Sequence, residues 1–264
     1  MKIDLNDKPT RILIQEYVNK IYNCGYEQET NYTLYKLIHT FDVLRTAKDL
    51  IKQTKPAPSK TMQKHILDAA LLHDIGRCYE YKNGKHQKID HGKVGADLIK
   101  KYLPQMKLEQ TTTLLHNKMP SENDPLEVRP VLNYVRDADM LANIRYQTDY
   151  TDAWLNHLLW SVSKDKLGSQ IDTEIKKAAQ NHTQVNAQKV QKRTFLNMVL
   201  GQLCWYHGLK TQAAIKIAKQ RKLFIHFRTA ICEKVLPRLE LSPKIQQNLA
   251  KEIEEIFPDT LFSQ

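Results

Sequence analysis

The stretch Leu71-Leu72-His73-Asp74-Ile75-Gly76-Arg77 decides how the rest of the chain is interpreted. In it, a histidine and an aspartate stand side by side after a mostly apolar run that begins at Ile66. A buried polar group without a partner is costly, so this pair is poorly placed inside an apolar helix. The pair suits the end of a buried helix, where both side chains can turn to one metal ion. The stretch therefore predicts a metal site at a helix terminus.

Helical spacing of apolar residues continues along the whole chain. Glycine is scarce, with 8 residues among 264, and β-branched residues show no convincing alternation of the kind strands have. We expect helices at about 10–24, 31–52, 59–74 and 90–103, one that ends at 116, one at about 125–141, and further helices to the end. The predicted fold class is therefore all-α.

Capping and breaking residues mark the ends of these helices. We expect Thr10, Ser59 and Ser242 to be N-caps, because their hydroxyls can accept hydrogen bonds from free helical N–H groups. Pro125 suits the first turn of a helix, and Pro130 is expected to kink that helix.

No linker, internal repeat or low-complexity tract divides the sequence. We expect a single all-α domain over 1–264, with a metal-site half at about 25–150 and a C-terminal helical extension at about 151–264. The apolar segment 195–206 is expected to be a buried helix. The aromatic residues of this extension are expected in the core rather than in a base-stacking surface: Trp154, Trp160, Trp205 and Tyr206.

The composition is that of a soluble globular protein, with 41% hydrophobic and 26% charged residues. No run approaches the roughly 18 apolar residues of a membrane span, and the N-terminus has no signal-peptide core. Four cysteines lie apart without CxxC spacing, which favours a cytoplasmic location. The formal net charge of +11 would attract phosphate-bearing ligands, from nucleotides to nucleic acid.

Several further histidines and aspartates strengthen the metal hypothesis. The candidate ligands are His39, His73, Asp74, His91, His116 and Asp139. Imidazole together with carboxylate suits Mn, Fe, Co, Ni or Zn, whereas Mg prefers more oxygen ligands. The absence of cysteine from the set is typical of a catalytic rather than a structural site.

The set is large enough for two ions. Asp74 could bridge them, with His39, His73 and Asp139 on one ion and His91 and His116 on the other. Two ions roughly 3.5–4 Å apart can clamp a phosphate, and a bound cation can lower the pKa of water from about 15.7 toward about 7. Asp74 is thus also the candidate catalytic residue.

The order of these residues resembles that of the HD-domain superfamily of metal-dependent phosphohydrolases. A bacterial branch of predicted HD hydrolases is similar in four segments: 71–77, Asp90-His91-Gly92-Lys93-Val94-Gly95-Ala96, His116-Asn117-Lys118 and Arg136-Asp137-Ala138-Asp139. The resemblance covers about 30–145 and, less specifically, 195–206. It implies that His39 and Asp139 are the first and last ligands, and that His91 and His116 mark a two-metal branch.

The chain also departs from related patterns. That branch often has Asp-Lys-Leu-Asp around the last ligand, where this chain has Asp139-Met140-Leu141-Ala142. Arg77 stands where the deoxynucleoside monophosphatase branch has glutamate, which disfavours that activity. No Glu-Asp pair follows the His-Asp motif as in an alarmone hydrolase, which weakens that reading.

Residues near the ligands have predicted supporting roles. Arg77 and Lys118 are candidates to bind the non-bridging oxygens of a substrate phosphate. Asp137 competes with Asp139 for the place of last ligand, since residues two apart on a helix point in different directions. Asp139 matches its context better, so Asp137 and Asn117 are expected to contact ligands rather than the ion. Six histidines are interpreted as structural: His65, His86, His157, His182, His207 and His226.

Three functions compete at this point. The first is a metal-dependent phosphohydrolase acting on a nucleotide or similar small phosphorylated molecule. The second is a nuclease or cyclic-nucleotide phosphodiesterase, although no arginine stripe with interleaved aromatics marks a nucleic-acid surface. The third is a sensor that binds a phosphorylated ligand without catalysis. No membrane partner is expected, and a homo-oligomer is compatible with the sequence.

Overall fold

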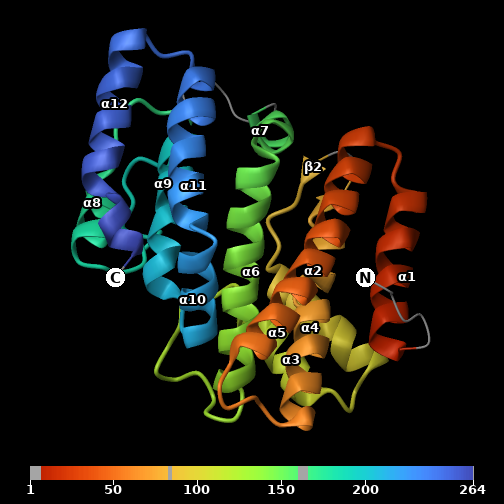
Figure 1. Cartoon of the computed structure of the whole chain (residues 1–264). Coiled ribbons are helices and arrows are strands. Elements are labelled where there is room, and N and C mark those ends of the chain that lie inside the picture. Colours follow the sequence, from red (N-terminus) through yellow and green to blue (C-terminus); the bar gives the residue numbers. More distant parts are fainter. Residues whose placement is uncertain (1–6, 83–84, 160–165, 264) are drawn as a thin grey trace. The chain divides into compact units, whose positions relative to one another are not determined.

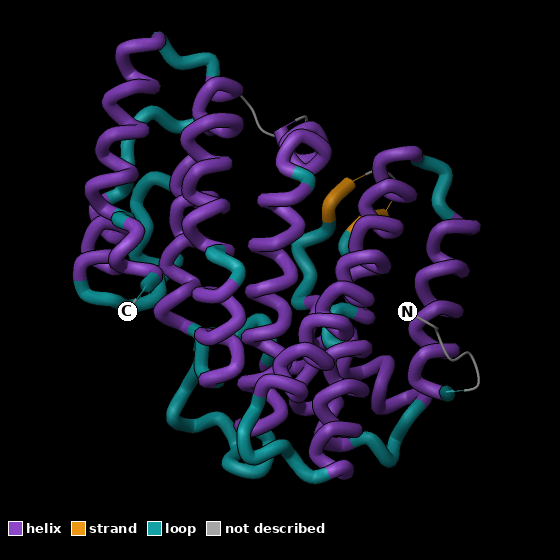
Figure 2. The backbone as a smooth tube through the Cα atoms, in the orientation of Figure 1, coloured by secondary structure: helices purple, strands orange, loops and turns teal. Residues whose placement is uncertain are grey.

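A computed structural model describes residues 7–82, 85–159 and 166–263. Apart from the connecting loops and two short strands, these residues are helical, which confirms the predicted all-α fold class (Figure 1, Figure 2). The chain divides into two compact units, Met1–Ala142 and Asn143–Gln264. This division lies close to the boundary expected near residue 150, whereas the single domain over 1–264 stays a prediction.

The first unit contains the elements from α1 to most of α6. They are α1 (Lys8–Asn23), α2 (Glu27–Gln53), α3 (Lys60–Leu72), the 3-10 helix η1 (Ile75–Tyr79), β1 (Tyr81–Lys82), β2 (Lys85–His86), α4 (His91–Tyr102), α5 (Lys107–Leu115) and α6 (Arg129–Asp149). The two strands pair antiparallel, with Tyr81 opposite His86.

The core of the first unit includes the apolar residues next to the His-Asp pair in the sequence. Its buried members come from α1, α3, η1, α4 and the residue that follows α4: Leu13, Tyr17, Leu71, Leu72, Ile75, Cys78, Ile99 and Leu103. Tyr17 also donates a hydrogen bond of 2.8 Å to the backbone carbonyl of Asp74. Apolar packing and this buried hydrogen bond together fix the backbone where α3 ends.

Two of the three expected N-caps are present. Ser59 caps α3 and Ser242 caps α12 (Pro243–Ile256) through their side chains. Thr10 is not a cap, because α1 begins earlier and the carboxylate of Asp7 accepts from the backbone N–H of Thr10 at 3.1 Å.

The prolines near α6 also differ from the prediction. Pro125 lies in the turn before the helix, where its carbonyl accepts from the backbone N–H groups of Val128 and Arg129. The helix begins at Arg129, so Pro130 falls in its first turn. A proline there removes no intrahelical hydrogen bond and has no reason to cause a kink.

The second unit contains the end of α6 and the elements after it. They are α7 (Thr151–Leu159), α8 (Thr173–Gln180), α9 (Phe195–Leu203), the 3-10 helix η3 (Cys204–Gly208), α10 (Gln212–Gln220), α11 (Leu223–Ala230), the π-helix η4 (Ile231–Val235), the 3-10 helix η5 (Leu236–Leu239), α12 and the 3-10 helix η6 (Asp259–Phe262). The expected helix at 195–206 is therefore α9 continued by η3.

Aromatic side chains fill much of the second core. Trp154 is buried, as predicted, with its ring 6.3 Å from that of Phe227 and 6.1 Å from that of Phe195. Tyr206 is also buried, whereas Trp205 is partly exposed and Trp160 lies outside the described residues.

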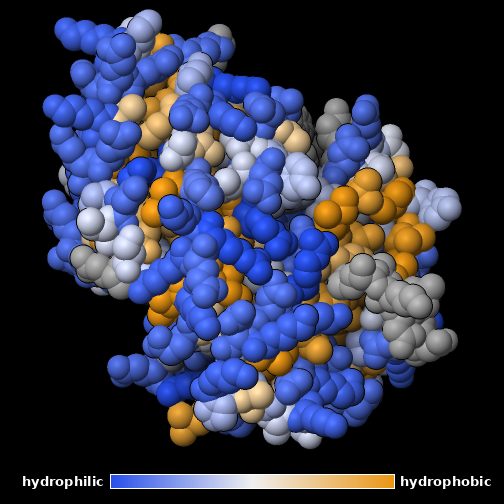
Figure 3. Space-filling view, in the orientation of Figure 1, coloured by the Kyte–Doolittle hydropathy of each residue, from blue (hydrophilic) through white to orange (hydrophobic). Residues whose placement is uncertain are grey.

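The surface agrees with the charge of the sequence. Hydrophilic residues cover most of the face shown in Figure 3, and apolar residues form smaller patches on it. In the described part of the chain, no helix combines the length and apolar character that crossing a bilayer requires.

Candidate metal centre

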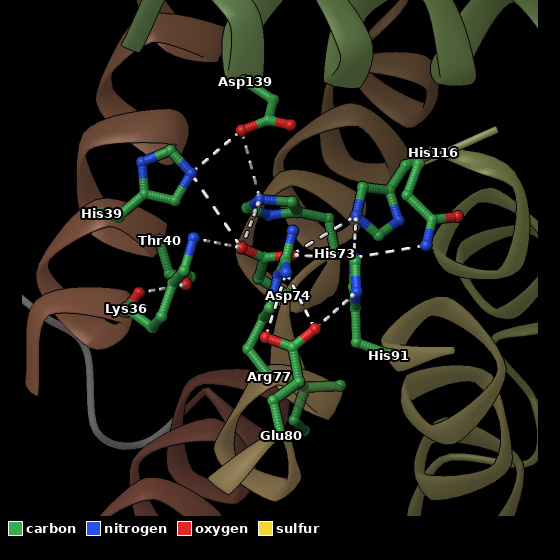
Figure 4. A network of polar contacts seen from close by, with 12 residues as sticks. Lys36, His39, Thr40, His73, Asp74, Arg77, Glu80, His91, His116 and Asp139 are labelled. Atoms are coloured by element: carbon green, nitrogen blue, oxygen red, sulfur yellow. Dashed lines mark hydrogen bonds and ion pairs between the residues drawn. The ribbon is translucent and has the colours of Figure 1, made fainter. Parts of the chain in front are cut away.

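The structure brings all six candidate ligands together within the first unit (Figure 4). Three of them lie in helices: His39 in α2, His91 at the start of α4 and Asp139 in α6. His73 and Asp74 lie directly after α3, and His116 lies directly after α5. Two triplets could each hold an ion: His39, His73 and Asp74, and Asp74, His91 and His116. Within each triplet the ligand atoms lie within 4.8 Å of one another.

The ends of α3 and α5 orient two of the histidines in the same way. Nδ1–H of His73 donates to the carbonyl of Ala70 at 2.8 Å, and Nδ1–H of His116 donates to the carbonyl of Thr113 at 2.7 Å. These carbonyls belong to the last helical turn, where they need donors from outside the helix ladder. With Nδ1 carrying the proton, each Nε2 turns an unprotonated lone pair to the centre, which is the form that binds a metal.

A carboxylate orients the third histidine. Nδ1 of His91 lies 3.1 Å from Oε1 of Glu80, and this contact leaves Nε2 to face the centre. Glu80 is 3% exposed and also accepts hydrogen bonds from Arg77 and from the hydroxyl of Tyr32. A carboxylate behind a ligand histidine is a common device of metal sites. Sequence reasoning missed Glu80, although its spacing of three residues from Arg77 was a usable signal.

The carboxylate of Asp74 stands between two groups of histidines. Its Oδ1 lies 3.3 Å from Nε2 of His116 and 3.6 Å from Nε2 of His91. Its Oδ2 lies 3.6 Å from Nε2 of His73 and 4.0 Å from Nε2 of His39. One oxygen therefore faces each group, as the predicted bridging role requires.

Asp139, rather than Asp137, reaches the first group. Oδ1 of Asp139 lies 2.9 Å from Nε2 of His39 and 3.8 Å from Nε2 of His73. Its side chain is 28% exposed, so the centre is accessible to solvent on this side. Asp137 is fully buried, and its predicted contact with a ligand stays a prediction.

The donor set fits divalent cations. Nε2 of His73 is buried and has no hydrogen-bond partner among the described residues, although carboxylate oxygens lie 3.6 and 3.8 Å away. Nε2 of His91 and Nε2 of His116 lie 3.3 Å apart, with the Nδ1 protons of both rings directed elsewhere. Lone pairs that face one another and face carboxylates repel, and a cation between them turns this repulsion into attraction.

The charge states at neutral pH support the same interpretation. Burial lowers the pKa of His73 to about 4, so its imidazole is neutral. Burial opposes ionisation of Asp74, but the positive charges of Arg77 and Lys36 outweigh it and hold the pKa of the carboxyl well below its usual range. The pKa of Glu80 is about 2, because hydrogen bonds and Arg77 overcome the effect of burial.

Two cations lie beside Asp74. Nε of Arg77 lies 3.2 Å from Oδ1 of Asp74, and its Nη1 lies 2.8 Å from Oε1 of Glu80. Nζ of Lys36, which sequence reasoning missed, lies 3.9 Å from Oδ2 of Asp74. Burial and the nearby Arg77 charge lower the pKa of Lys36. Its place three residues before His39 on α2 was the available signal.

The remaining predicted residues lie at the rim. Nδ2 of Asn117 lies 3.3 Å from Nε2 of His91 and 3.3 Å from Oδ1 of Asp90. Asn117 therefore contacts a candidate ligand, as expected. The ammonium of Lys118 is 4.0 Å from Oδ2 of Asp90 and its side chain is 47% exposed. The roles of Lys118 and Arg77 in phosphate binding stay predictions.

Glycines allow the close packing that assembles the centre. A Cβ atom on Gly76 would lie 2.1 Å from the carbonyl oxygen of His91, and one on Gly92 would lie 2.9 Å from the carbonyl oxygen of Thr113. Because backbone rather than a flexible side chain occupies these places, η1 meets α4, and α4 meets α5, only without side chains there.

Among the histidines interpreted as structural, His65 pairs with Glu109 at 2.6 Å, outside the centre. The rings of His182 and His207 lie 5.1 Å apart in the second unit. The exposed His226 is in α11, and the side chains of His86 and His157 are outside the described residues.

Comparison with known proteins gives one match. Residues 37–154 match the family model of the HD domain, and this range contains all six candidate ligands. Neither the curated proteins nor the solved structures contain a significant match to the chain.

Proposed function

The chain belongs, through residues 37–154, to the HD-domain superfamily of metal-dependent phosphohydrolases, and from this premise we propose the reaction that it catalyses. The proposed reaction is hydrolysis of a phosphate ester or anhydride in a nucleotide or similar small phosphorylated molecule. HD domains bind divalent metals, and bound ions would supply charge stabilisation at phosphorus and a water of lowered pKa.

The two-sided placement of the Asp74 carboxylate carries this proposal. One oxygen lies within 3.6 Å of two histidine nitrogens, and the other lies within 4.0 Å of two different ones. We propose that Asp74 bridges two ions, one held with His39, His73 and Asp139 and the other with His91 and His116. Mn, Fe, Co, Ni and Zn suit these nitrogen and oxygen donors better than Mg.

The cations beside Asp74 have a role in substrate binding. A phosphate that enters from the exposed side at Asp139 would meet the ammonium of Lys36 and the guanidinium of Arg77. Charge-assisted hydrogen bonds from these groups would hold its non-bridging oxygens and orient phosphorus for in-line attack. Such groups contribute most to rate where they stabilise charge that develops in the transition state.

A metal and turnover experiment tests the proposal. The purified protein is reconstituted with Mn, Co, Ni or Zn, its metal content is measured, and it is assayed with p-nitrophenyl phosphate, its bis-ester and a panel of nucleotides. We expect two ions per chain and hydrolysis in the intact protein, with both reduced in Asp74→Asn. Asp68→Asn is the matched control, because Asp68 is a buried aspartate of α3 that pairs with Lys64 outside the centre.

The same assay separates the other two hypotheses. Cleavage confined to cyclic nucleotides or oligonucleotides would identify the phosphodiesterase or nuclease. Full metal occupancy without turnover of any substrate would replace the enzyme with the sensor.

A further inference from the structure

A pocket of about 670 Å³ lies wholly within the second unit. Its walls are the loop at 185–190, the exposed side of α9 with Trp205, and Lys166. Pockets of about 300–1,000 Å³ that are lined by apolar and aromatic residues with a few polar groups are typical of small-molecule sites. The metal centre belongs to the first unit, so its chemistry does not account for this pocket.

Hydrogen bonds of two buried residues, Asn197 and Asp172, hold the wall of the pocket in place. Nδ2 of Asn197 donates to the carbonyls of Gln170 and Lys192 at 3.2 and 3.0 Å. Its Oδ1 accepts from the backbone N–H of Asp172 at 2.9 Å. The carboxylate of Asp172 in turn accepts from the backbone N–H groups of Gln191 and Lys192. The segment that leads into α9 is therefore ordered without a ligand, which lowers the cost of binding one.

A glycine inside α9 keeps the pocket open. Gly201 lines the pocket, and the nearest atom to a Cβ placed on it is Cγ2 of Val185, 3.9 Å away. A glycine inside a helix costs about 1 kcal/mol relative to alanine, and here no close backbone approach requires one. The missing side chain instead leaves space between α9 and the loop at 185–190.

The residues that line the pocket indicate which kind of ligand it can bind. Phe195, Met198 and Trp205 supply an apolar and aromatic surface, and Met198 is 48% exposed although it lies on an apolar helix. The expectation that Trp205 is a core residue is wrong, because its partly exposed ring lines this pocket. An aromatic face of this kind stacks readily on a planar base.

Polar and charged side chains also line the pocket. Oε1 of Gln202 has no hydrogen-bond partner among the described residues, so rotation of the amide can offer an acceptor and donors to a base edge. Lys166 and Arg193 add two exposed positive charges to the lining. We propose that this pocket binds a nucleotide, with the base against Trp205 and the phosphate toward Arg193 and Lys166. The pocket is formed by residues of the second unit, and the proposal does not depend on the proposed reaction.

Binding in the absence of metal tests the proposal. The full chain is titrated with AMP, GMP and ATP in the presence of a chelator, and binding is measured by calorimetry and by tryptophan fluorescence. We expect binding that persists in Asp74→Asn and weakens about tenfold or more in Gly201→Leu, whose side chain would fill the pocket. Gly201→Ala is the matched control and should stay within about twofold, because a methyl group there meets only ordinary contacts.

Additional variants, a folding control and a second type of ligand distinguish the possible outcomes of this experiment. Arg193→Gln should weaken AMP more than adenosine, because only AMP carries the phosphate. Thermal unfolding checks that Gly201→Leu is folded, and Val185→Phe fills the pocket from the opposite wall if it is not. Absence of nucleotide binding, or binding that both filled variants retain, would overturn the proposal. Binding of laurate without any nucleotide would also overturn it and assign the pocket to an apolar acid.

Discussion

Oε1 of Glu80 lies 3.1 Å from Nδ1 of His91, while Nε2 of the same ring lies 3.6 Å from Oδ1 of Asp74. One imidazole thus joins a buried carboxylate behind it to the candidate bridging carboxylate in front. We predict that Glu80→Gln weakens binding of the ion beside His91 and His116, because the ring loses a charged acceptor and is held less firmly. Losses of about 10- to 100-fold in metal affinity are usual for such changes.

Metal titration followed by equilibrium dialysis measures this effect. Glu109→Gln is the matched control, because Glu109 is also buried and pairs with a histidine, His65, outside the centre. It should alter stability but leave metal affinity unchanged. Equal metal loss in both variants would mean that the Glu80 effect is structural rather than local.

Lys36 provides the second prediction. Its Nζ lies 3.9 Å from Oδ2 of Asp74, and the ring centre of Tyr35 lies 5.1 Å from it. Lys36→Gln removes a positive charge without emptying the space. We expect kcat/KM for a phosphate monoester to fall about 10- to 100-fold, which corresponds to losing one charge-assisted hydrogen bond.

The metal content of Lys36→Gln should remain that of the intact protein, because lysine is not among the candidate ligands. Lys52→Gln, at the exposed end of α2, serves as the control and should retain full activity. Loss of metal in Lys36→Gln would assign this lysine to assembly of the centre instead of to the substrate.

The sequence was sufficient to predict the helical class and the convergence of the six candidate ligands. The His73-Asp74 pair after an apolar run pointed to a helix end, and α3 does end at Leu72. Histidine and aspartate could be named as metal ligands because imidazole and carboxylate groups bind divalent ions wherever they lie in the fold. The helix end depends on local sequence, whereas the expected convergence of ligands far apart in the chain came from the resemblance to the HD-domain superfamily.

Spacing placed Glu80 near Arg77 and Lys36 near His39, but it did not show what either residue contacts, because their roles depend on distances between elements. Glu80 follows η1, and only the packing of η1 against α4 brings it to His91. Pro130 shows a different limitation. A proline predicts a kink only if the helix extends before it, and here the start of α6 lies one residue earlier.

Gly76 should be intolerant of any side chain. A Cβ atom there would lie 2.1 Å from the carbonyl oxygen of His91 and 2.7 Å from the backbone nitrogen of Gly95. Gly76→Ala must therefore separate η1 from α4, which moves Asp74 away from His91. We expect a loss of about 1–3 kcal/mol in unfolding free energy, as for other overpacked sites, together with weaker metal binding. Denaturant unfolding and metal titration measure the two effects.

Gly25→Ala is the control for this substitution, because nothing lies within 4 Å of a Cβ atom placed there. It should leave both stability and metal binding close to those of the intact protein. If Gly76→Ala matched Gly25→Ala in both measurements, close packing of η1 and α4 would not be what assembles the centre.

Asp172 supplies a prediction about pH. It is 4% exposed, and its carboxylate caps α8 and accepts from the backbone N–H groups of Glu174, Gln191 and Lys192. Burial alone would raise the pKa of this carboxyl, but the three donors outweigh it and hold the pKa below its ordinary value. A depressed folded-state pKa adds stability above the unfolded-state pKa, and this stability is lost as the pH falls through the folded-state value.

Asp172→Asn should therefore cost about 1–3 kcal/mol of unfolding free energy at pH 7, because one acceptor oxygen becomes a donor that faces backbone N–H groups. The difference from the intact protein should shrink as the pH falls below about 4, since the intact carboxylate then takes up a proton. Urea unfolding of both proteins from pH 7 to pH 3 measures this difference. Asp152→Asn is the control, because Asp152 forms an exposed pair with Arg238, which contributes little. A constant difference across this pH range would show that shape rather than charge makes Asp172 important to the second unit.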